Sequence, residues 1–369
     1  MNILIVENSV AFTGALKSAL CEAYLLSNKH KISFLLPSHS TALPIIREKG
    51  FKVHALPLKE ISKSPSALLA YPFIIIRNLF ALKKIVRSED IEVVQINDFY
   101  NLLGALLKLS GYKGILLTWV RFLPSALPGA LRTIWIKAAQ KYSDRVIAVS
   151  DVVWKQLPQD KKTIRLYDPV CFSNSLRTET QTNQLVTFLY LSNFIRGKGQ
   201  EYAIEAFARA YKKDNNIRLK LVGGDMGLHK NKVFRDELVN QVRQLGLEDV
   251  IVFNDFIADV ETEIKSADVV LNFSNGEALS MICLEASFYE RPVIATRCGG
   301  PEEIILHKET GLLVPRKDIT AMTEAMLTLS NNMHLRKTYG QKATLHVTQK
   351  FSNEAFKKAM DEILNEHVN

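Results

Sequence analysis

Two glutamates, Glu277 and Glu285, are the residues of this sequence best placed to do chemistry. An apolar run ends before the turn-rich stretch Ser274–Leu279, and Ser280 is a suitable N-cap for a helix over Met281–Tyr289. Glu277 would then lie in the loop, and Glu285, a little over one turn into the helix, could point back to the same opening. The free N–H groups of the first helical turn would face this opening beside the positive end of the helix dipole. Carboxylates that accept hydrogen bonds from hydroxyls, next to amides that hold phosphates, suit a nucleotide-sugar.

The two acids stand inside a longer motif between residues 271 and 303. EALS leads into the helix, and PVIAT-x-x-GG-x-x-E follows it. This pattern resembles the retaining glycosyltransferases of the GT-B fold, glycosyltransferase family 4, also called group 1. The resemblance is densest from Phe188 to Pro315 and thinner in the N-terminal half. It implies that Glu277 contacts the donor sugar and that Glu285 contacts the ribose hydroxyls. The alternative is that Glu277 is a solvated loop acid and Glu285 an acid on the surface of the helix.

A glycine-rich loop after the strand Val186–Leu191 supplies candidate phosphate ligands. The resemblance implies G-R-x-x-x-x-K-G here, with the Arg and Lys neutralising the donor diphosphate. Lys198 matches, Asn193 stands where the Arg is expected, and Arg196 is the candidate for the missing charge, with a solvated basic loop as the alternative. The other residues expected to contact the donor lie at strand ends and at the helix start: Gly223, Phe256, Ile257, Ala278, Leu279, Ser280 and Met281.

Candidates on the acceptor side follow two strands of the N-terminal half. Asn97 and Asp98 come just after an apolar strand, where doubly wound sheets keep their ligand groups. Relatives often have T-x-H after the next strand, but this sequence has Thr118-Trp119-Val120-Arg121 without a His. We therefore take Asp98 and Arg121 as catalytic candidates, and Asn97 and Gly14 as acceptor-side residues. Gly14 would let the backbone approach a ligand at a helix start. For each of them an ordinary loop role is the alternative.

Alternating strand and helix signals predict two Rossmann-like doubly wound parallel-sheet domains that face each other across a cleft, the GT-B arrangement. The length of 369 residues fits two domains. Residues 1–170 form the expected acceptor-side domain, residues 186–350 the nucleotide-sugar-binding domain, and a polar linker joins them. A helix over about 351–369 is expected to pack back on the first domain.

The positive charge is confined to the first half of the chain. Residues 1–165 contain 23 Lys and Arg against 11 Asp and Glu, a balance of +12, which leaves −3 for the remainder. Such a patch favours an anionic partner: a membrane surface, an anionic glycan or nucleic acid. Two basic, aromatic helical stretches, 72–87 and 131–145, suggest a peripheral membrane role, with sheet-covering helices as the alternative. Nucleic acid is disfavoured because no binding module is recognisable.

The longest apolar run, Ala67–Ile76, is half of the roughly 20 residues that span a bilayer. The first residues enter a strand directly without a secretory pattern, and the four cysteines form no C-x-x-C pair and are expected to be reduced. These features predict a cytoplasmic protein that is peripheral on the inner face of the plasma membrane. No D-x-D occurs, so neither a metal nor a cofactor is expected, and a UDP- or GDP-sugar would be the donor substrate.

The implied reaction is transfer of a sugar to a hydroxyl of a glycan or lipid-linked acceptor with retention of anomeric configuration, in cell-surface polysaccharide or glycolipid synthesis. Alternatives are a nucleotide-sugar epimerase or a phosphorylase on the same fold, and a non-catalytic sugar-nucleotide-binding or membrane-scaffolding protein. The sequence does not identify the base, the sugar, the acceptor or the oligomeric state.

Overall fold

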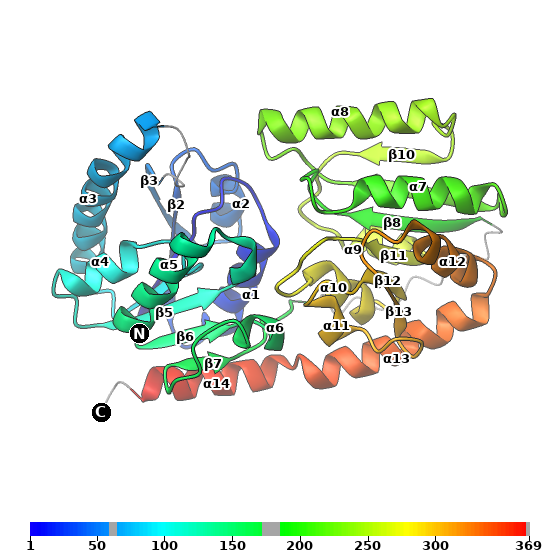
Figure 1. The fold of residues 1–369 in the computed structure, drawn as a ribbon. Coiled ribbons are helices and arrows are strands. Elements are labelled where there is room, and N and C mark those ends of the chain that lie inside the picture. Colours follow the sequence, from blue (N-terminus) through cyan, green and yellow to red (C-terminus); the bar gives the residue numbers. More distant parts are fainter. Residues whose placement is uncertain (59–64, 172–184, 367–369) are drawn as a thin grey trace. The chain divides into compact units, whose positions relative to one another are not determined.

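The computed structural model describes residues 1–58, 65–171 and 185–366, and it divides into two compact units (Figure 1). Unit 1 consists of Met1–Pro169 and Asn353–Asn369, and unit 2 consists of Val170–Ser352. Most of the predicted polar linker, residues 172–184, lies outside the described residues, as do the last three residues of the predicted C-terminal helix.

Unit 1 contains a seven-stranded parallel sheet in the order β3-β2-β1-β4-β5-β6-β7. Its strands are β1 (Asn2–Val6), β2 (Lys31–Pro37), β3 (Lys52–Leu56), β4 (Val93–Ile96), β5 (Ile115–Val120), β6 (Arg145–Ala148) and β7 (Thr163–Arg165). The central strands are buried along their length because helices cover both faces, which explains their unbroken apolar runs. The strand order reverses between β1 and β4, and this reversal defines the switch point of the sheet.

The helices of unit 1 begin and end as follows: α1 (Gly14–Leu26), α2 (Leu43–Glu48), α3 (Pro65–Ser88), α4 (Leu103–Leu109), α5 (Gly129–Tyr142), α6 (Asp151–Trp154) and α14 (Asn353–Asn365), with a 3₁₀ turn at Pro124–Ala126. Leu82 of α3 and Leu107 of α4 pack with Leu4 and Val6 of β1 in one apolar cluster. The last helix, α14, packs on this unit, since Phe356 stacks on Trp119 with ring centroids 6.2 Å apart.

Unit 2 contains a six-stranded parallel sheet in the order β10-β9-β8-β11-β12-β13. Its strands are β8 (Val186–Leu191), β9 (Ile217–Val222), β10 (Ile251–Asn254), β11 (Val269–Asn272), β12 (Val293–Thr296) and β13 (Gly311–Val314). Its helices are α7 (Gln200–Tyr211), α8 (His229–Gln244), α9 (Glu261–Ser266), α10 (Met281–Phe288), α11 (Pro301–Ile304), α12 (Ile319–Ser330) and α13 (Met333–Lys350). Phe188, Phe207 and Phe273 lie fully buried in its core. The predicted fold class, two Rossmann-like parallel-sheet domains, is confirmed.

The cysteines differ from expectation. Cys21 and Cys171 are disulfide-bonded, whereas Cys283 and Cys298 are free and buried. The expectation that all four are reduced was therefore wrong for the first two. It relied on spacing along the chain, which carries no information about distances in the folded protein.

Candidate active site

Glu277 lies in the loop between β11 and α10, and its backbone is tied to the loop that follows β12. The Glu277 N–H donates to the Cys298 carbonyl at 3.2 Å, and the Gly300 N–H donates to the Glu277 carbonyl at 2.8 Å. A Cβ on Gly300 would lie 2.6 Å from the Leu279 Cα, so only glycine allows the two loops to approach this closely. The carboxyl ends of neighbouring parallel strands thus hold Glu277 in a fixed position.

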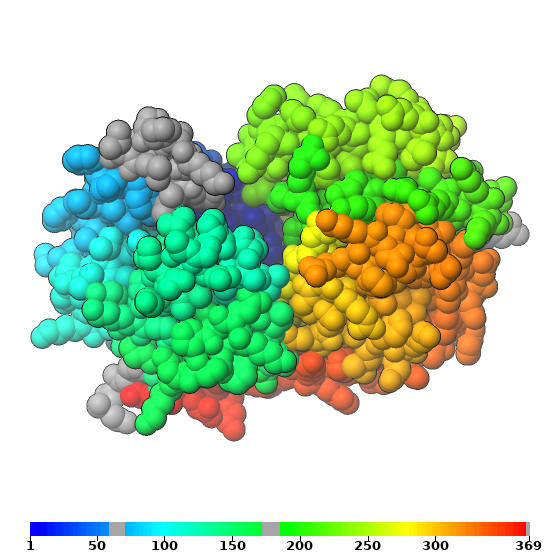
Figure 2. All heavy atoms as spheres, viewed as in Figure 1, coloured from blue at the N-terminus to red at the C-terminus, as the bar shows by residue number. Residues whose placement is uncertain are grey.

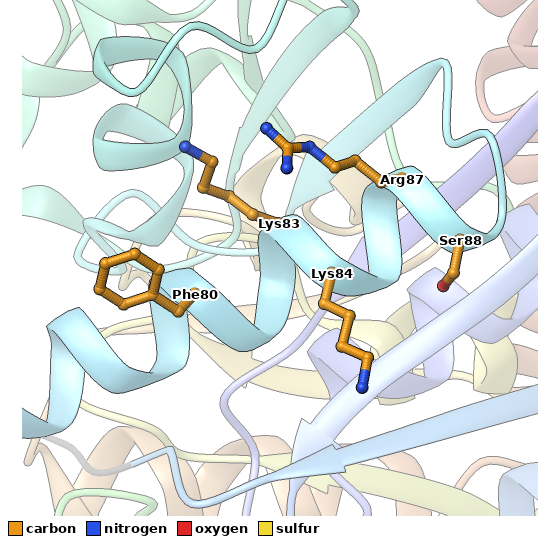
Figure 3. Close-up of a pocket in the computed structure, with 5 residues that line it drawn as sticks. All are labelled: Phe80, Lys83, Lys84, Arg87 and Ser88. Atoms are coloured by element: carbon orange, nitrogen blue, oxygen red, sulfur yellow. The ribbon is translucent and has the colours of Figure 1, made fainter.

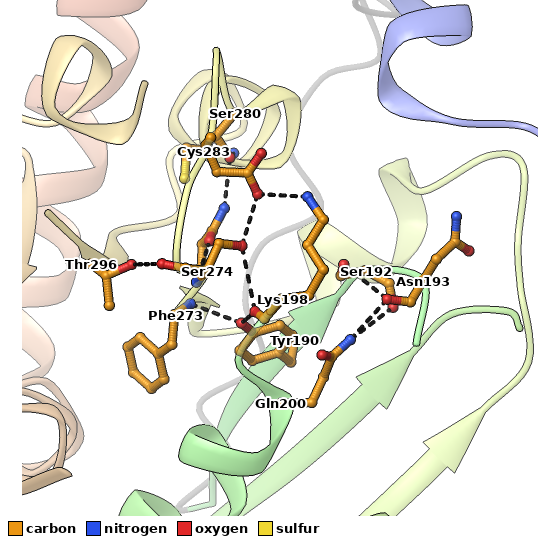
Figure 4. A network of polar contacts seen from close by, with 12 residues as sticks. Tyr190, Ser192, Asn193, Lys198, Gln200, Phe273, Ser274, Ser280, Cys283 and Thr296 are labelled. Atoms are coloured by element: carbon orange, nitrogen blue, oxygen red, sulfur yellow. Dashed lines mark hydrogen bonds and ion pairs between the residues drawn. The ribbon is translucent and has the colours of Figure 1, made fainter. Parts of the chain in front are cut away.

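The Glu277 carboxylate forms an ion pair with Lys198 (Figure 4). Its Oε1 accepts a hydrogen bond from Lys198 Nζ at 2.8 Å and another from Ser274 Oγ at 2.8 Å. Burial alone would lower the pKa of Lys198, but the adjacent Glu277 charge and hydrogen bond raise it above its usual value. Lys198 therefore keeps its positive charge at neutral pH. The structure brings together two residues that the sequence analysis assigned to different parts of the donor.

Tyr190 of β8 joins the loop that carries Lys198 to the loop that carries Glu277. Its hydroxyl donates to the Lys198 carbonyl and accepts from the Phe273 N–H at 2.8 Å. Burial raises the pKa of Tyr190 well above its usual value, so the hydroxyl keeps its proton and remains a donor. Gly199 adopts a φ of +86°, and a Cβ there would lie 2.1 Å from the Phe273 carbonyl oxygen. The Lys198 loop can follow this path only with glycine at position 199.

The start of α10 lies in the same segment as Glu277. Ser280 caps the helix, since its Oγ accepts from the Cys283 N–H at 3.4 Å and from Asn272 Nδ2 at 2.7 Å. Ala278, Leu279 and Ser280 are buried and Met281 is half-buried. Glu285 is only 5% exposed on α10. The positive end of the helix dipole therefore lies beside the Lys198–Glu277 pair, where it favours a bound anion.

Asn193, which replaces the arginine expected from the resemblance, connects two strand ends of unit 2. Its Oδ1 accepts from the Gly224 N–H at 3.2 Å. A Cβ on Gly223 would lie 2.0 Å from the Ser192 carbonyl oxygen, which shows how closely the loops after β8 and β9 approach. Phe256 lies against Gly224 and is 40% exposed, and the adjacent Ile257 is half-buried. These contacts place Asn193 beside the segment expected to hold the base.

Arg196 is directed to another partner. Its guanidinium donates to Glu237 of α8 at 2.6 Å and lies 4.9 Å from the centre of the Phe234 ring. Both members of this ion pair are largely exposed. The structure therefore does not bring Arg196 to Lys198. The sequence gives no indication that Arg196 pairs with Glu237, because the two residues are 41 positions apart.

Asn97 lies at the switch point of unit 1 and contacts a residue that the sequence analysis missed, Glu7. Asn97 Nδ2 donates to Glu7 Oε2, and the N–H and Oγ of Ser9 donate to Glu7 Oε1 at 2.9 and 2.7 Å. Glu7 and Asn97 are buried, and the Asn97 Oδ1 is buried without a hydrogen-bond partner. An acid directly after the first strand was the signal that could have identified Glu7.

Asp98 follows Asn97 and is also buried. Burial raises the pKa of Asp98 well above its usual value, and the nearby Glu7 charge raises it further. Its Oδ1 accepts from the Arg121 backbone N–H at 3.2 Å. Gly14, the exposed first residue of α1, follows the N-cap Thr13.

The Arg121 side chain turns into the interior of unit 1, where it is 1% exposed. Its Nε donates to Asp168 at 2.8 Å, its Nη2 donates to Glu22 of α1 at 3.1 Å, and Gln95 of β4 donates to the same Glu22 oxygen. The guanidinium lies 4.1 Å from the centre of the Trp119 ring. With all three groups ionised, this cluster carries a net charge of −1. We refer to Glu22, Arg121 and Asp168 as the buried triad.

The buried triad gives unit 1 a pH dependence. Burial raises the pKa of Glu22 from 4.5 to about 6, with Arg121 opposing the shift. Between these values the folded state holds a proton that the unfolded chain has already released, so the free energy of unfolding falls as pH rises from about 4.5 to about 6. We expect Glu22→Gln to remove this dependence while it keeps an acceptor for Arg121. Urea unfolding followed by tryptophan fluorescence would test it, because Trp119, Trp135 and Trp154 all lie in unit 1. A variant with the same pH profile as the parent would contradict the assignment.

Among the described residues, no three His, Cys, Asp or Glu side chains are grouped so that they could hold a metal ion. Over the same residues, no helix has the length and apolar character needed to cross a membrane.

The match to a known protein family falls within unit 2. Residues 175–346 match the family described as glycosyl transferases group 1. An uncharacterised glycosyltransferase of Methanocaldococcus jannaschii is 28% identical over 283 residues, which cover 74% of this chain and 74% of the relative. A D-inositol 3-phosphate glycosyltransferase of Arthrobacter is 27% identical over 190 residues, 48% of this chain and 44% of that protein. Other curated relatives are likewise matched over less than two thirds of their own length.

Solved structures match over nearly the whole chain. Anabaena HepE in complex with UDP and glucose aligns with a TM-score of 0.84 and 18% identity over 99% of both chains. Sucrose-phosphate synthase of Thermosynechococcus elongatus aligns with a TM-score of 0.81 and 18% identity, over 99% of this chain and 98% of that chain. At such identities these structures establish only the GT-B fold. Support for a glycosyltransferase comes from the family match and the sequence relatives.

Proposed function

We propose that this protein is a retaining glycosyltransferase that moves a sugar from a nucleotide-sugar to a hydroxyl of a glycan or lipid-linked acceptor. The observation that carries the proposal is the Lys198–Glu277 ion pair beside the N-terminus of α10. The cation and the helix start suit the diphosphate and the negative charge that develops on it during the reaction. The carboxylate suits the hydroxyls of the sugar.

Donor binding would separate the ion pair, with Lys198 bound to the diphosphate and Glu277 to the sugar. The diphosphate offers Lys198 a stronger partner, since it carries more charge than one carboxylate, and it would also lie at the helix start. The Glu277 carboxylate, still held by Ser274, then becomes free to accept a hydrogen bond from a sugar hydroxyl. Phe256 and Ile257 would flank the base, and Glu285 would hold the ribose. The UDP in the Anabaena HepE structure supports a UDP-sugar, with a GDP-sugar as the alternative.

In the proposed reaction the bond between the anomeric carbon and the diphosphate oxygen breaks, and the bond to the acceptor oxygen forms on the same face of the sugar. The acceptor proton passes to the departing diphosphate, so no protein nucleophile is needed. Lys198 and the amides at the start of α10 stabilise the negative charge that develops on the leaving group. This lowers the barrier because the charge is larger in the transition state than in the bound donor. The sugar donor is the only small molecule required, and the proposal includes no cofactor.

The acceptor would bind in unit 1, where Asn97 and Asp98 lie at the switch point near Gly14. Asn97, which Glu7 holds in place, would belong to the acceptor side of the site. Asp98, whose pKa burial raises well above its usual value, is the catalytic candidate beside the acceptor hydroxyl. Arg121 acts through its backbone N–H, which positions Asp98, while the buried triad holds its side chain. We assign the activity to cell-surface polysaccharide or glycolipid synthesis at the cytoplasmic face of a membrane.

The function is tested by incubation with UDP- and GDP-sugars and candidate acceptors while released nucleoside diphosphate is measured. A transferase releases diphosphate only when sugar is transferred or hydrolysed, whereas an epimerase releases none and a binding protein leaves the donor unchanged. The named relatives do not favour either of these alternatives. A thermal-shift series with the same nucleotides identifies the base, because a ligand that binds the native state raises Tm.

Lys198→Ala is expected to weaken nucleoside diphosphate binding at least about tenfold, because it removes a charge-assisted hydrogen bond of roughly 1.5–3 kcal/mol. Nucleoside without phosphates should bind as before, and calorimetric titration with both ligands would measure the difference. Arg196→Ala is the matched control, since Arg196 pairs with Glu237, and it should leave diphosphate binding nearly unchanged. Equal losses for nucleoside and diphosphate in Lys198→Ala would mean that the loop, rather than a phosphate contact, had been disturbed.

A further inference from the structure

The outer face of α3 in unit 1 carries a stripe of side chains that the proposed reaction does not use. Phe73, Ile76 and Phe80 are 77%, 51% and 68% exposed. Arg77, Lys84 and Arg87 are exposed on the same helix. At 100° per residue these six positions fall within an arc of about 100°, so they form one face, which we call the α3 stripe. The opposite face is buried at Asn78, Leu82 and Val86.

The α3 stripe is chemically graded along the helix. Its first part carries Phe73, Ile76 and Phe80 with Arg77 among them, and its last part, Lys84 and Arg87, is cationic. Near the end of the helix a surface hollow of about 450 Å³ is lined by Phe80, Lys83, Lys84, Arg87 and Ser88. Figure 3 shows these side chains projecting from α3, with Lys83 and Arg87 on one side and Lys84 and Ser88 on the other. Figure 2 shows this part of the chain, in light blue, at the surface of unit 1.

The charge on and around the α3 stripe is predominantly positive. α3 contains no Asp or Glu between residues 65 and 88. In the part of the chain that the structure describes, no carboxylate forms an ion pair with Arg77, Lys84 or Arg87. The surrounding residues 1–165 carry a balance of +12. Such unneutralised cations favour an anionic partner.

We propose that the α3 stripe docks unit 1 on an anionic phospholipid surface, with headgroup phosphates held in the hollow by Lys84, Arg87 and Ser88. Two exposed phenylalanines and an isoleucine beside cations are typical of helices that lie in a membrane interface, where apolar side chains enter the acyl boundary and cations stay at the headgroups. A nucleic acid would use the cations but gives no reason for the apolar half of the stripe. The other basic helix, α5, buries Trp135 and Ala139 against the sheet, so it carries less of the argument.

This inference rests on the surface of unit 1 and not on the donor site, although it supplies a location for the lipid-linked acceptor of the proposed function. The test is co-sedimentation of the full chain, without nucleotide, with vesicles of phosphatidylcholine alone or with about one third phosphatidylglycerol. The parent is expected to bind the anionic vesicles, and raised salt should weaken this binding as the charges are screened. Diphosphate binding, measured separately, reports on the donor site whether or not vesicles are bound.

Substitution of Arg77, Lys84 and Arg87 by Ser is expected to lower partition onto the anionic vesicles about a hundredfold, since each cation near such a surface contributes about a fivefold effect. Phe73→Ser with Phe80→Ser should also reduce binding. The matched control replaces Lys212, Lys213 and Arg218 of unit 2, which are also exposed, and it should bind as the parent does. Equal loss in the control, binding insensitive to salt, or binding of duplex DNA but not vesicles would overturn the proposal.

Discussion

Glu277→Gln is expected to reduce transfer of sugar by about 10²–10³-fold while binding of nucleoside diphosphate is retained. The substitution removes the negative charge from the group that would hold a donor hydroxyl, yet it keeps an oxygen that can accept from Ser274 and Lys198. The ground-state contacts to the phosphates should therefore survive, and the loss should appear in kcat. Steady-state kinetics with a saturating donor, together with titration of the diphosphate, would separate the two effects.

Glu237→Gln is the matched control for this prediction. Glu237 is an acid of the same unit that pairs with Arg196 at the surface. Its amide variant should transfer sugar at the parent rate. This result would show that removal of a carboxylate from unit 2 does not by itself reduce transfer. A Glu277→Gln variant that transfers sugar at the normal rate would refute the assignment of the active site.

Arg121→Met is expected to lower the free energy of unfolding of unit 1 by about 3–5 kcal/mol, because Glu22 and Asp168 would be left buried without their cation. For a unit of this size the loss corresponds to a decrease in Tm of roughly 10 °C. Both partners are nearly inaccessible to water, so solvent cannot replace the guanidinium. Urea unfolding followed by tryptophan fluorescence reports on unit 1 alone.

The control for the buried triad is Arg165→Met. Arg165 pairs with Asp151 at 2.8 Å in the same unit, but both side chains are about half exposed. Exposed pairs of this kind contribute about 1 kcal/mol or less, so the same substitution should have a small effect. Addition of Glu22→Gln to Arg121→Met should recover part of the lost stability because it removes one of the stranded charges. Equal losses at positions 121 and 165 would show that the triad does not stabilise unit 1.

The sequence by itself determined the class of fold and several local features of the proposed donor site. Unbroken apolar strands that alternate with helices form parallel sheets with both faces covered, and this pattern is local enough to be recognised without a structure. Ser280 as a helix cap, and Lys198 beside glycines, were likewise predicted from neighbouring residues. Local signals of this kind depend on backbone geometry within a few residues.

Only the tertiary structure decided what the charged side chains do, because a charge acts on whichever groups the fold brings within a few ångströms. Arg121 was a catalytic candidate in the sequence, but Glu22 and Asp168, 99 and 47 residues away, hold its guanidinium in the interior. Arg196 pairs with Glu237 rather than supplementing Lys198. In the first part of α3 each face is mainly apolar with one polar residue, Arg77 on the exposed face and Asn78 on the buried one, so periodicity could not distinguish the two faces. Side chains of β1 and α4 pack against Leu82 and Val86, so this face is buried. Phe73 and Phe80, on the other face, remain exposed to solvent.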